Sequence, residues 1–323
     1  MRFLVVGAGV IGSLYAGRLA LAGHEVELAA RGRRLAELRE GGVRLFDEVR
    51  GRAETAPVRV VEAGDPEAPY DAVFAALRRD QLEAALPALA RLRAAKVFVT
   101  MTNGADLAKA AGGALGEGRL LLGFPGAGGA RRGDGSIAYR VVPGFVQPAT
   151  VGEASGGVSP RVGAIVAALR GAGFPSAASS DMTSWQRSHL ALVCPMANAV
   201  YLKAGPDAGA GAAAGGRAAL SALAADRRAL ETMVDAIREG FALVEASGGR
   251  VEPARLALAF SLPRGLLARV FGAAMKGEWG ETVVARHALS ARGEMRMLND
   301  ELLALAGRSG QAMPNFRELA ARA

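Results

Sequence analysis

Short apolar runs alternate with amphipathic stretches through the first half of the chain, the pattern of strands joined by helices in a parallel sheet. Residues 2–6 form the first run and lead through a glycine-rich turn into the helical spacing of residues 13–20. A second run, residues 25–30, follows at the length of one strand–helix–strand unit. The other elements expected in this half are strands continuing the sheet at 71–77, 96–101, 120–124, 139–142 and 150–152, helices at 82–92 and 160–171, a hairpin-like excursion at 41–52 and 54–61, and a loop at 125–135.

The strand-like runs stop near residue 178, and the chain then becomes rich in alanine and leucine at helical spacing. We therefore expect two domains, residues 1–178 and 179–323. Helices are expected at 185–202, 218–247 (as one or two), 253–258, 263–275 and 290–306, with a glycine-alanine interruption at 205–216 and a short terminal helix. The predicted fold is α/β, a Rossmann-type doubly wound sheet followed by an all-α C-terminal domain.

The turn after the first strand has the spacing of a dinucleotide-binding motif. It reads Gly7-Ala8-Gly9-Val10-Ile11-Gly12. In such a motif the first glycine makes a tight turn, the second lets the backbone approach a pyrophosphate, and the third lets the helix pack closely on the strand. The positive end of the helix then faces the diphosphate. We expect these six residues to bind the cofactor.

The end of the second strand indicates which cofactor. A site for NAD or FAD commonly places Asp or Glu about 20 residues after the motif to hold the ribose 2′-hydroxyl. This chain has Ala30-Arg31 there, followed by Arg33 and Arg34. A guanidinium group suits a 2′-phosphate, so the sequence predicts NADP(H), with Arg31 as the phosphate contact. The alternative is that Arg33 and Arg34 only solvate the next helix.

Two further polar residues follow expected strands. Arg78 comes after the strand at 71–77, and Asn103 comes after the strand at 96–101. Ligands of doubly wound sheets bind outside the carboxyl ends of the strands, so both residues are expected beside the glycine turn. Arg78 would serve a cofactor phosphate or a substrate carboxylate. Asn103 would hold the nicotinamide ribose or the substrate, or would only form an Asn-Gly turn.

Composition excludes several other classes of protein. The chain is 51% hydrophobic and 22% charged, as a globular protein is. No apolar segment approaches the about 18 residues of a membrane span, and the apolar start is too short for a signal peptide, so we expect a cytoplasmic protein. The single cysteine, Cys194, excludes an intrachain disulfide and is expected to be a packed thiol. The three histidines are scattered, so no metal site is predicted.

The net charge of +8 is dispersed and dominated by arginine, with only 5% aromatic residues. We therefore expect no nucleic-acid partner, although the charge would steer anionic ligands toward the protein. A small-molecule substrate is the expected partner. A homodimer through the helical half is a further expectation, resting on composition alone.

Taken together, these motifs resemble those of the ketopantoate reductases, also called 2-dehydropantoate 2-reductases, over nearly the whole chain. That family consists of NADPH-dependent 2-oxoacid reductases. The matching residues are the glycine turn, Arg31, Leu77-Arg78, Thr102-Asn103-Gly104, the helix opening at 185–191, Gly293-Glu294-Met295-Arg296 with Asn299, and Met313-Pro314-Asn315.

The resemblance implies hydride transfer from NADPH to the carbonyl carbon of ketopantoate, giving pantoate, or of a related substrate. Arg187 stands where the family has a general-acid lysine. Arginine stays protonated near neutral pH, so Arg187 would polarise the carbonyl. Glu294 matches the acid that binds the substrate hydroxyl, and the alternative is a carboxylate that the dipole favours at a helix N-terminus. The family's two substrate-holding asparagines fall on Ala191 and Pro195, and its carboxylate-binding serine falls near Thr282.

The proton donor is open. His189 is one candidate because its unperturbed pKa lies near neutrality, although residues two apart on a helix do not share a face. Water and Lys203 are the others. Two other functions also stay open: a dehydrogenase of the 3-hydroxyacid or opine type, and a non-catalytic NADPH-binding regulator. Ala30-Arg31 argues against the 3-hydroxyacid type, and the missing lysine and asparagines would motivate the regulator.

Overall fold

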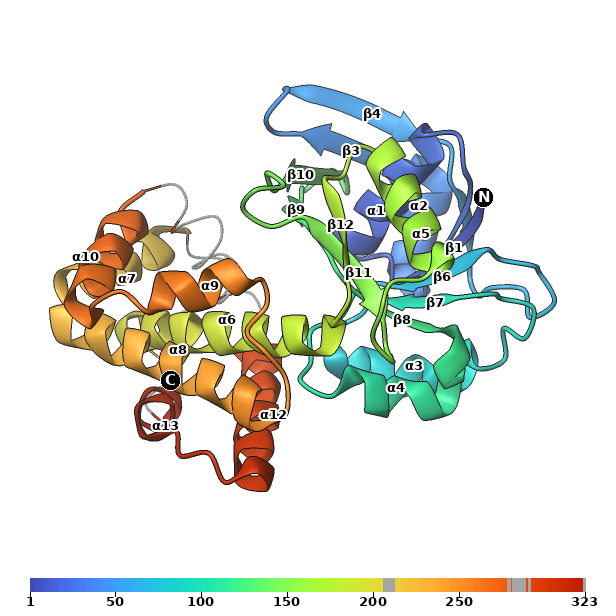
Figure 1. Cartoon of the computed structure of the whole chain (residues 1–323). Helices are drawn as coiled ribbons and strands as arrows, with labels where there is room; N and C mark the ends of the chain where they lie inside the picture. Colours follow the sequence, from blue (N-terminus) through green and yellow to red (C-terminus); the bar gives the residue numbers. More distant parts are fainter. Residues whose placement is uncertain (206–212, 278–279, 281–288, 290–291, 322–323) are drawn as a thin grey trace. The chain divides into compact units, whose positions relative to one another are not determined.

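The computed structural model describes all residues except 206–212, 278–279, 281–288, 290–291 and 322–323. The chain forms two compact units, Met1–Thr183 and Ser184–Ala323 (Figure 1). The expected boundary at residue 178 lies within strand β12 (Ser176–Ser179), which pairs with β11 (Ala149–Glu153) and is therefore part of the first unit.

The first unit is built on an eight-stranded sheet in the order β12-β11-β8-β7-β6-β1-β2-β5. Its other strands are β1 (Arg2–Val6), β2 (Glu25–Ala29), β5 (Arg59–Val61), β6 (Ala72–Ala75), β7 (Phe98–Thr100) and β8 (Leu120–Phe124). The pairs from β5 to β8 are all parallel, and β11 runs antiparallel to β8. This order places β1 inside the sheet, with β2 and β5 on one side and β6, β7 and β8 on the other, so the chain is wound outward in both directions and the predicted doubly wound α/β fold is confirmed.

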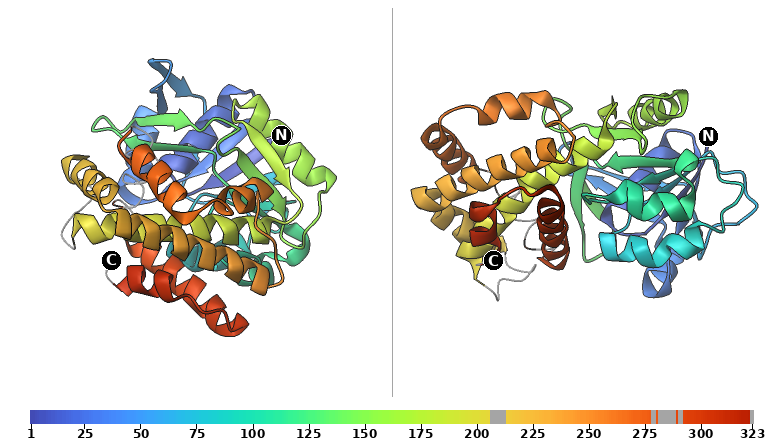
Figure 2. Two further views of the ribbon diagram at one scale, coloured as in Figure 1. Left: turned by 60° about the vertical axis from the view of Figure 1, so that its left-hand side comes forward. Right: turned by 60° about the horizontal axis from the view of Figure 1, so that its bottom comes forward.

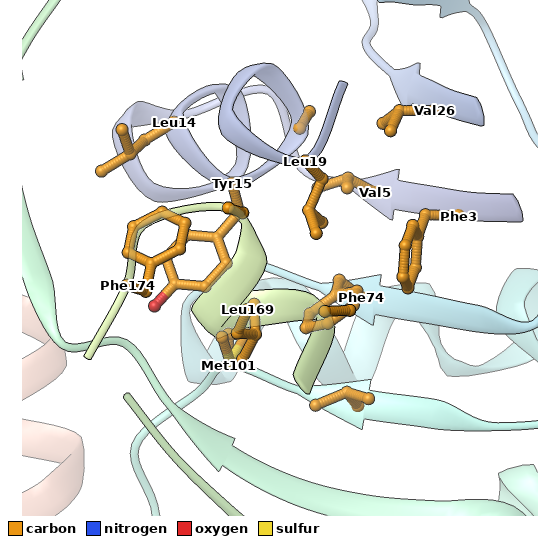
Figure 3. Close-up of a cluster of buried hydrophobic side chains, with 14 of the residues drawn as sticks. Phe3, Val5, Leu14, Tyr15, Leu19, Val26, Phe74, Met101, Leu169 and Phe174 are labelled. Atoms are coloured by element: carbon orange, nitrogen blue, oxygen red, sulfur yellow. The ribbon is translucent and has the colours of Figure 1, made fainter. Parts of the chain in front are cut away.

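Helices cover both faces of this sheet (Figures 1 and 2). On one face lie α1 (Val10–Leu21), α2 (Gly32–Gly41) and α5 (Pro160–Gly171), and on the other lie α3 (Arg79–Leu89) and α4 (Leu107–Leu115). A short 3-10 helix, η1 (Glu117–Arg119), precedes β8. Figure 3 shows the core under α1 and α5, where the Tyr15 ring stacks on Phe174 with centroids 4.3 Å apart. The stack packs α1 against the segment that follows α5.

A second, four-stranded sheet was not expected. Its order is β4-β3-β10-β9, with bounds β3 (Val43–Asp47), β4 (Arg52–Ala56), β9 (Ala127–Arg131) and β10 (Ile137–Val141). The hairpin-like excursion is confirmed only in part, as the antiparallel pair β3–β4. Residues 59–61, expected in its second strand, form β5 and pair in parallel with β2 in the main sheet. Two other expectations were wrong. Residues 125–135 contain a strand rather than only a loop, and the strand near residue 140 pairs with β3 rather than with the main sheet.

Close packing against α1 holds this second sheet in place. A Cβ atom on Gly17 of α1 would lie only 2.8 Å from the Leu45 side chain of β3. The glycine inside α1 therefore lets the second sheet approach the helix more closely than any other residue would allow. The second sheet thus packs on the helix that follows the glycine turn.

The described residues of the second unit contain helices and no strand. They are the remainder of α6 (Met182–Ala204), then α7 (Ala213–Ala225), α8 (Arg227–Ala246), α9 (Ala254–Phe260), α10 (Arg264–Met275), α12 (Arg292–Ser309) and α13 (Pro314–Ala321). The all-α prediction is confirmed for this part of the chain. Part of the interruption expected at 205–216 lies outside the described residues.

Two contacts fix the helices of the second unit around α6. Gly240 of α8 packs so closely on Ala191 of α6 that a Cβ atom on the glycine would lie 2.7 Å from the alanine Cβ. Asn198 of α6 and Asn299 of α12 exchange two buried amide hydrogen bonds, of 3.2 and 3.0 Å. Buried amides need such partners because an unpaired one costs free energy.

The last helix is held by an acidic side chain from α8. Glu239 accepts hydrogen bonds from the backbone N–H groups of Asn315 and Phe316 at 3.1 and 2.9 Å, and from the Asn315 side chain at 2.6 Å. These groups lie in the first turn of α13, where the helix dipole favours a negative charge. The carboxylate therefore fixes the start of α13 on α8.

No single helix among the described residues is both long and apolar enough to cross a membrane. The bent pair α9 and α10 passes that test only when its two helices are counted together.

An ion pair joins the end of β11 to the start of α5. Glu153 accepts hydrogen bonds from the hydroxyl of Ser159, the N-cap residue of α5, and from the Arg161 guanidinium, with Nε 2.8 Å from Oε1. The Arg161 hydrogen bond lowers the pKa of Glu153 below its ordinary value near 4.5, despite partial burial. The pair therefore adds stability above that pH, which is lost as the pH falls through the lowered pKa.

We predict that Glu153→Gln lowers the free energy of unfolding at pH 7 by about 1–3 kcal/mol, because a neutral amide cannot make both charge-assisted bonds. The difference between variant and wild type should shrink as the pH falls below about 4.5. Denaturant unfolding at several pH values measures it. A difference that stays constant down to pH 3 would contradict the ion-pair explanation.

Candidate functional site

The glycine turn lies where three strand ends meet. Gly7 N–H donates to the Ala29 carbonyl at the end of β2, at 3.4 Å, and Ala76 N–H, just after β6, donates to the Val6 carbonyl at 2.9 Å. The Thr102 hydroxyl, just after β7, donates to Leu77 O at 2.8 Å. The segments expected beside the turn are thus joined along one edge of the sheet.

The three glycines of the turn are needed for two different reasons. Gly7 has a φ of +106°, and a Cβ atom there would lie 2.4 Å from Ala76 O. A Cβ atom on Gly12 would lie 1.8 Å from Gly7 O. Gly9 has no atom of another residue within 4 Å of its Cβ position. Gly7 and Gly12 are therefore required by the fold, whereas the space beside Gly9 is open to a ligand.

The residues around Gly9 fit a diphosphate. Gly9 is the N-cap of α1 and supplies no side chain to cap it. The N–H groups of the first helical residues, Val10 to Gly12, have no partner within the helix, so they and the helix dipole favour an anion. Behind the turn, the buried Ser13 hydroxyl donates to the Ala8 carbonyl at 3.3 Å. The turn is thus braced on one side and open on the other.

The three arginines after β2 differ in their surroundings. Arg31 is exposed, and among the described residues its guanidinium has no hydrogen-bond or ion-pair partner. Arg33 has an 82% exposed side chain that pairs with Glu37 at 3.2 Å. Arg34 has a 15% exposed side chain and donates to the Ala8 carbonyl at 3.2 Å. Arg31 therefore has its guanidinium available for a phosphate, whereas Arg34 belongs to the turn, a role that sequence reasoning missed.

Arg78 and Arg79 also differ in their exposure. Arg78 is the N-cap of α3, with a 56% exposed side chain whose Nε lies 3.5 Å from Asp80. Arg79 is buried and pairs with Glu83 at 2.8 Å. The preference for Arg78 as the ligand contact thus agrees with its exposure. Asn103 is half-buried, directly after Thr102 on the same edge.

In the second unit, α6 carries two of the three residues expected to be catalytic. Arg187 and His189 are both half-buried. The His189 ring stacks on that of Trp185, one turn earlier, with centroids 5.4 Å apart and planes at 8°. Positions two residues apart on an α-helix are rotated by about 200° about its axis, so the side chains of Arg187 and His189 project from different sides of α6. The structure therefore gives the two side chains different surroundings.

The positions that match the family's asparagines are packing positions in this protein. Ala191 is fully buried against Gly240, and Pro195 is also buried within α6. Cys194 is a buried thiol, as expected, and burial raises its pKa. Thr282 lies outside the described residues.

Lys203, a possible proton donor on sequence grounds, has a structural partner. Its Nζ lies 2.6 Å from Asp226, which also accepts a hydrogen bond from Ala229 N–H as the N-cap of α8. The Lys203 hydrogen bond and this capping bond lower the pKa of Asp226. Lys203 therefore joins the end of α6 to the start of α8.

Glu294 lies in the first turn of α12 and is half-buried. Burial is the main reason why the pKa values of Cys194 and Tyr201 on α6 are raised, and the charge of Glu294 contributes to both shifts. The charge of Glu294 thus acts on side chains in the C-terminal half of α6. The paired amides of Asn198 and Asn299 join the same two helices, and sequence reasoning did not single out Asn198.

Comparisons with known proteins agree with this arrangement. Residues 3–153 match the family described as ketopantoate reductase PanE/ApbA. A 2-dehydropantoate 2-reductase of Mesorhizobium japonicum is 31% identical over 202 residues, which cover 57% of this chain and 61% of that protein. The chain therefore matches less than two thirds of the length of this curated relative.

Solved structures of low sequence identity share the fold over nearly the whole chain. A PanE/ApbA family ketopantoate reductase from Ralstonia eutropha JMP134 has a TM-score of 0.74 at 21% identity, covering 99% of this chain and 96% of that one. A 2-dehydropantoate 2-reductase from Geobacter metallireducens GS-15 has a TM-score of 0.74 at 17% identity, covering 100% and 98%.

We predict that Gly9→Ala and Gly12→Ala separate binding from folding. Gly9→Ala places a methyl group in open space, so it should cost at most about 1 kcal/mol of stability but weaken NADPH binding about tenfold or more. Gly12→Ala forces the helix away from Gly7 and should cost about 2–3 kcal/mol. Thermal unfolding and fluorescence titration with NADPH measure both effects. Equal NADPH affinity in Gly9→Ala and wild type would contradict the assignment of this space.

Proposed function

We propose, from the match of residues 3–153 to the ketopantoate reductase family, that this chain is an NADPH-dependent reductase of a 2-oxoacid, either ketopantoate or a related compound. One observation carries the proposal. The end of β2 presents an exposed arginine, Arg31, on the same edge of the sheet as the open space at Gly9. An oxidised or reduced NADP carries a 2′-phosphate and a diphosphate that match these two features.

The first unit would bind the nucleotide. In this proposal the start of α1 holds the diphosphate at Gly9, and Arg31 pairs with the 2′-phosphate through charge-assisted hydrogen bonds. Arg78, exposed at the start of α3, adds a second positive charge on the same edge of the sheet. Asn103 would hold the nicotinamide ribose or the substrate.

The second unit would supply the groups that act on the substrate. NADPH, when bound, supplies the hydride that reduces the carbonyl carbon. Arg187 polarises the carbonyl and stabilises the negative charge that develops on its oxygen. Because a guanidinium does not release its proton near neutral pH, His189 or water supplies the proton. Glu294 accepts a hydrogen bond from the substrate hydroxyl.

The substrate pocket would differ from that of the wider family. Ala191 and Pro195 are buried within the helical unit, and an asparagine side chain at position 191 would have to displace Gly240 of α8. This chain therefore holds its substrate without those two amides. We infer that the substrate is a 2-oxoacid whose recognition depends on Arg187 and Glu294.

The remaining proposals concern partners and location. We propose a small-molecule substrate, no nucleic-acid or membrane partner, and a cytoplasmic location, where a single unpaired cysteine is usual. A homodimer is also proposed. It is supported by the exposed apolar side chains of Leu258 and Val270 on α9 and α10, since exposed apolar surface is typical of interaction sites.

We predict that the wild type oxidises NADPH with at least one of ketopantoate, pyruvate and a set of bulkier 2-oxoacids. Arg187→Ala should lower kcat about 100-fold or more, because the charge on the alkoxide loses its stabilising cation. Arg227→Ala is the control, since Arg227 is exposed and pairs with Glu231 on α8. Absorbance at 340 nm reports turnover.

Tight NADPH binding without turnover of any oxoacid would instead favour the non-catalytic regulator. Turnover that Arg187→Ala leaves unchanged would show that the reaction proceeds through other residues. Turnover of ketopantoate itself would identify the substrate.

We also predict that Arg31→Ala raises KM for NADPH about tenfold or more and leaves KM for NADH within about twofold, because only NADPH carries the 2′-phosphate. Arg33→Ala removes the same charge from an exposed position already paired with Glu37, so it should change both KM values little. Initial rates with either cofactor measure the ratio. Equal losses for NADPH and NADH in Arg31→Ala would refute the phosphate assignment.

A further inference from the structure

We propose that Arg34 is a positioning residue for the cofactor, which fixes the shape of the glycine turn by tying it to a hairpin turn of the second sheet. The inference rests on the proposed function, because it gives Arg34 a part in binding the same cofactor. In this proposal the four-stranded sheet helps to shape the cofactor site, although none of its residues has to contact the cofactor.

The Arg34 guanidinium joins three segments of the chain. Its Nε donates to the Ala8 carbonyl at 3.2 Å, and one Nη lies 3.5 Å from the Ser13 hydroxyl. The other Nη donates to the Gly135 carbonyl at 3.2 Å and to Glu37 at 3.3 Å. A planar group with fixed donor directions suits such a junction, and lysine lacks this geometry.

The contact with Ala8 determines the direction of a neighbouring donor. The carbonyl of Ala8 and the N–H of Gly9 belong to the same planar trans peptide group, so they point in opposite directions. When Arg34 holds the carbonyl, it also orients the Gly9 N–H. Because Gly9 borders the open space, this donor is preorganised before the cofactor arrives.

The hairpin that holds the other end of Arg34 is itself well ordered by hydrogen bonds. Asp134 accepts from the N–H and the hydroxyl of Ser136 at 3.0 and 2.6 Å, and the Asp134 carbonyl accepts from Arg44 of β3. Arg132 and Gly135 close the turn through a backbone hydrogen bond of 3.0 Å. The Gly135 carbonyl is therefore a fixed acceptor.

Glu37 is an ion-pair partner of three arginines. It pairs with Arg33 at 3.2 Å, with Arg34 at 3.3 Å and with Arg131 of β9 at 3.2 Å. Exposed pairs such as that of Arg33 contribute little, but Arg34 is largely buried and bound on several sides. Arg34 is thus committed to protein acceptors, whereas Arg31 has none among the described residues.

The test compares Arg34→Ala with Arg33→Ala in the full chain. Both variants remove one positive charge and one partner of Glu37, but only the first removes the bonds to Ala8 and Gly135. Arg34→Ala should raise the NADPH dissociation constant and KM about tenfold, with kcat within about twofold. It should also speed amide hydrogen exchange over residues 7–13 of the nucleotide-free protein. Arg33→Ala should change neither quantity appreciably.

A second pair of variants tests the hairpin end without touching α2. Asp134→Ala loosens the turn from an exposed position and should weaken NADPH binding about twofold to threefold. Glu48→Ala is the matched control, because Glu48 pairs with Arg140 on the same sheet. If Arg34→Ala does not fold, Arg34→Lys replaces it, with a smaller loss expected in the same direction.

Equal NADPH affinity and equal exchange in the Arg34 and Arg33 variants would overturn the proposal. So would an exchange increase in Arg34→Ala that is spread evenly over the first unit, since that result would indicate a merely structural role. A wild type that binds no NADPH would refute the proposed function. Hydrogen exchange in the nucleotide-free variants would still decide whether Arg34 holds the turn.

Discussion

The close approach of β1 and α1 at the glycine turn is the constraint on which the site depends. Gly12 lies so near the Gly7 carbonyl that no side chain fits between strand and helix. The helix therefore begins directly at the edge of the sheet, between the ends of β2 and β6. Its unpaired N–H groups consequently face the edge to which β2 brings Arg31 and β6 brings Arg78. Without this contact the same residues would still be present, but they would not lie together at one edge of the sheet.

Much of the first unit was predictable because its signals are local. Apolar runs, glycine spacing and strand lengths gave the doubly wound sheet and the residues along its edge. The second sheet was missed because β9 reads Ala-Gly-Gly-Ala-Arg and has no alternating pattern. Pairing with β10 makes it a strand. A Cβ atom on Gly129 would lie 2.2 Å from Ala138 O, so the glycines that weaken the pattern also permit this pairing. The role of Arg34 was missed because its acceptor, the Gly135 carbonyl, lies 101 residues away in the sequence.

In the helical unit the elements could be predicted from the sequence, but the roles of individual residues could not. Helical spacing predicted its elements, but the sequence does not say which face of α6 meets a ligand. Ala191 and Pro195 align with ligand-holding positions, yet the structure uses them for packing, with Gly240 allowing α8 to approach. Asn198 and Asn299 bond to each other, so they join α6 to α12. The roles of the polar and small residues on α6 thus depend on which residues pack against them in the folded protein.

The composition of the second sheet has a consequence for the order of folding. Its β3–β4 hairpin and its β9–β10 hairpin are separated by several elements of the main sheet, and the Tyr139 hydroxyl of β10 meets Asp47 of β3 across 92 residues. Closing so long a loop is entropically unfavourable until the intervening strands have already brought its ends together. We therefore expect the four-stranded sheet to assemble after the main sheet. The contact between Gly135 and Arg34 would form with it, so the glycine turn would reach its final shape late in folding.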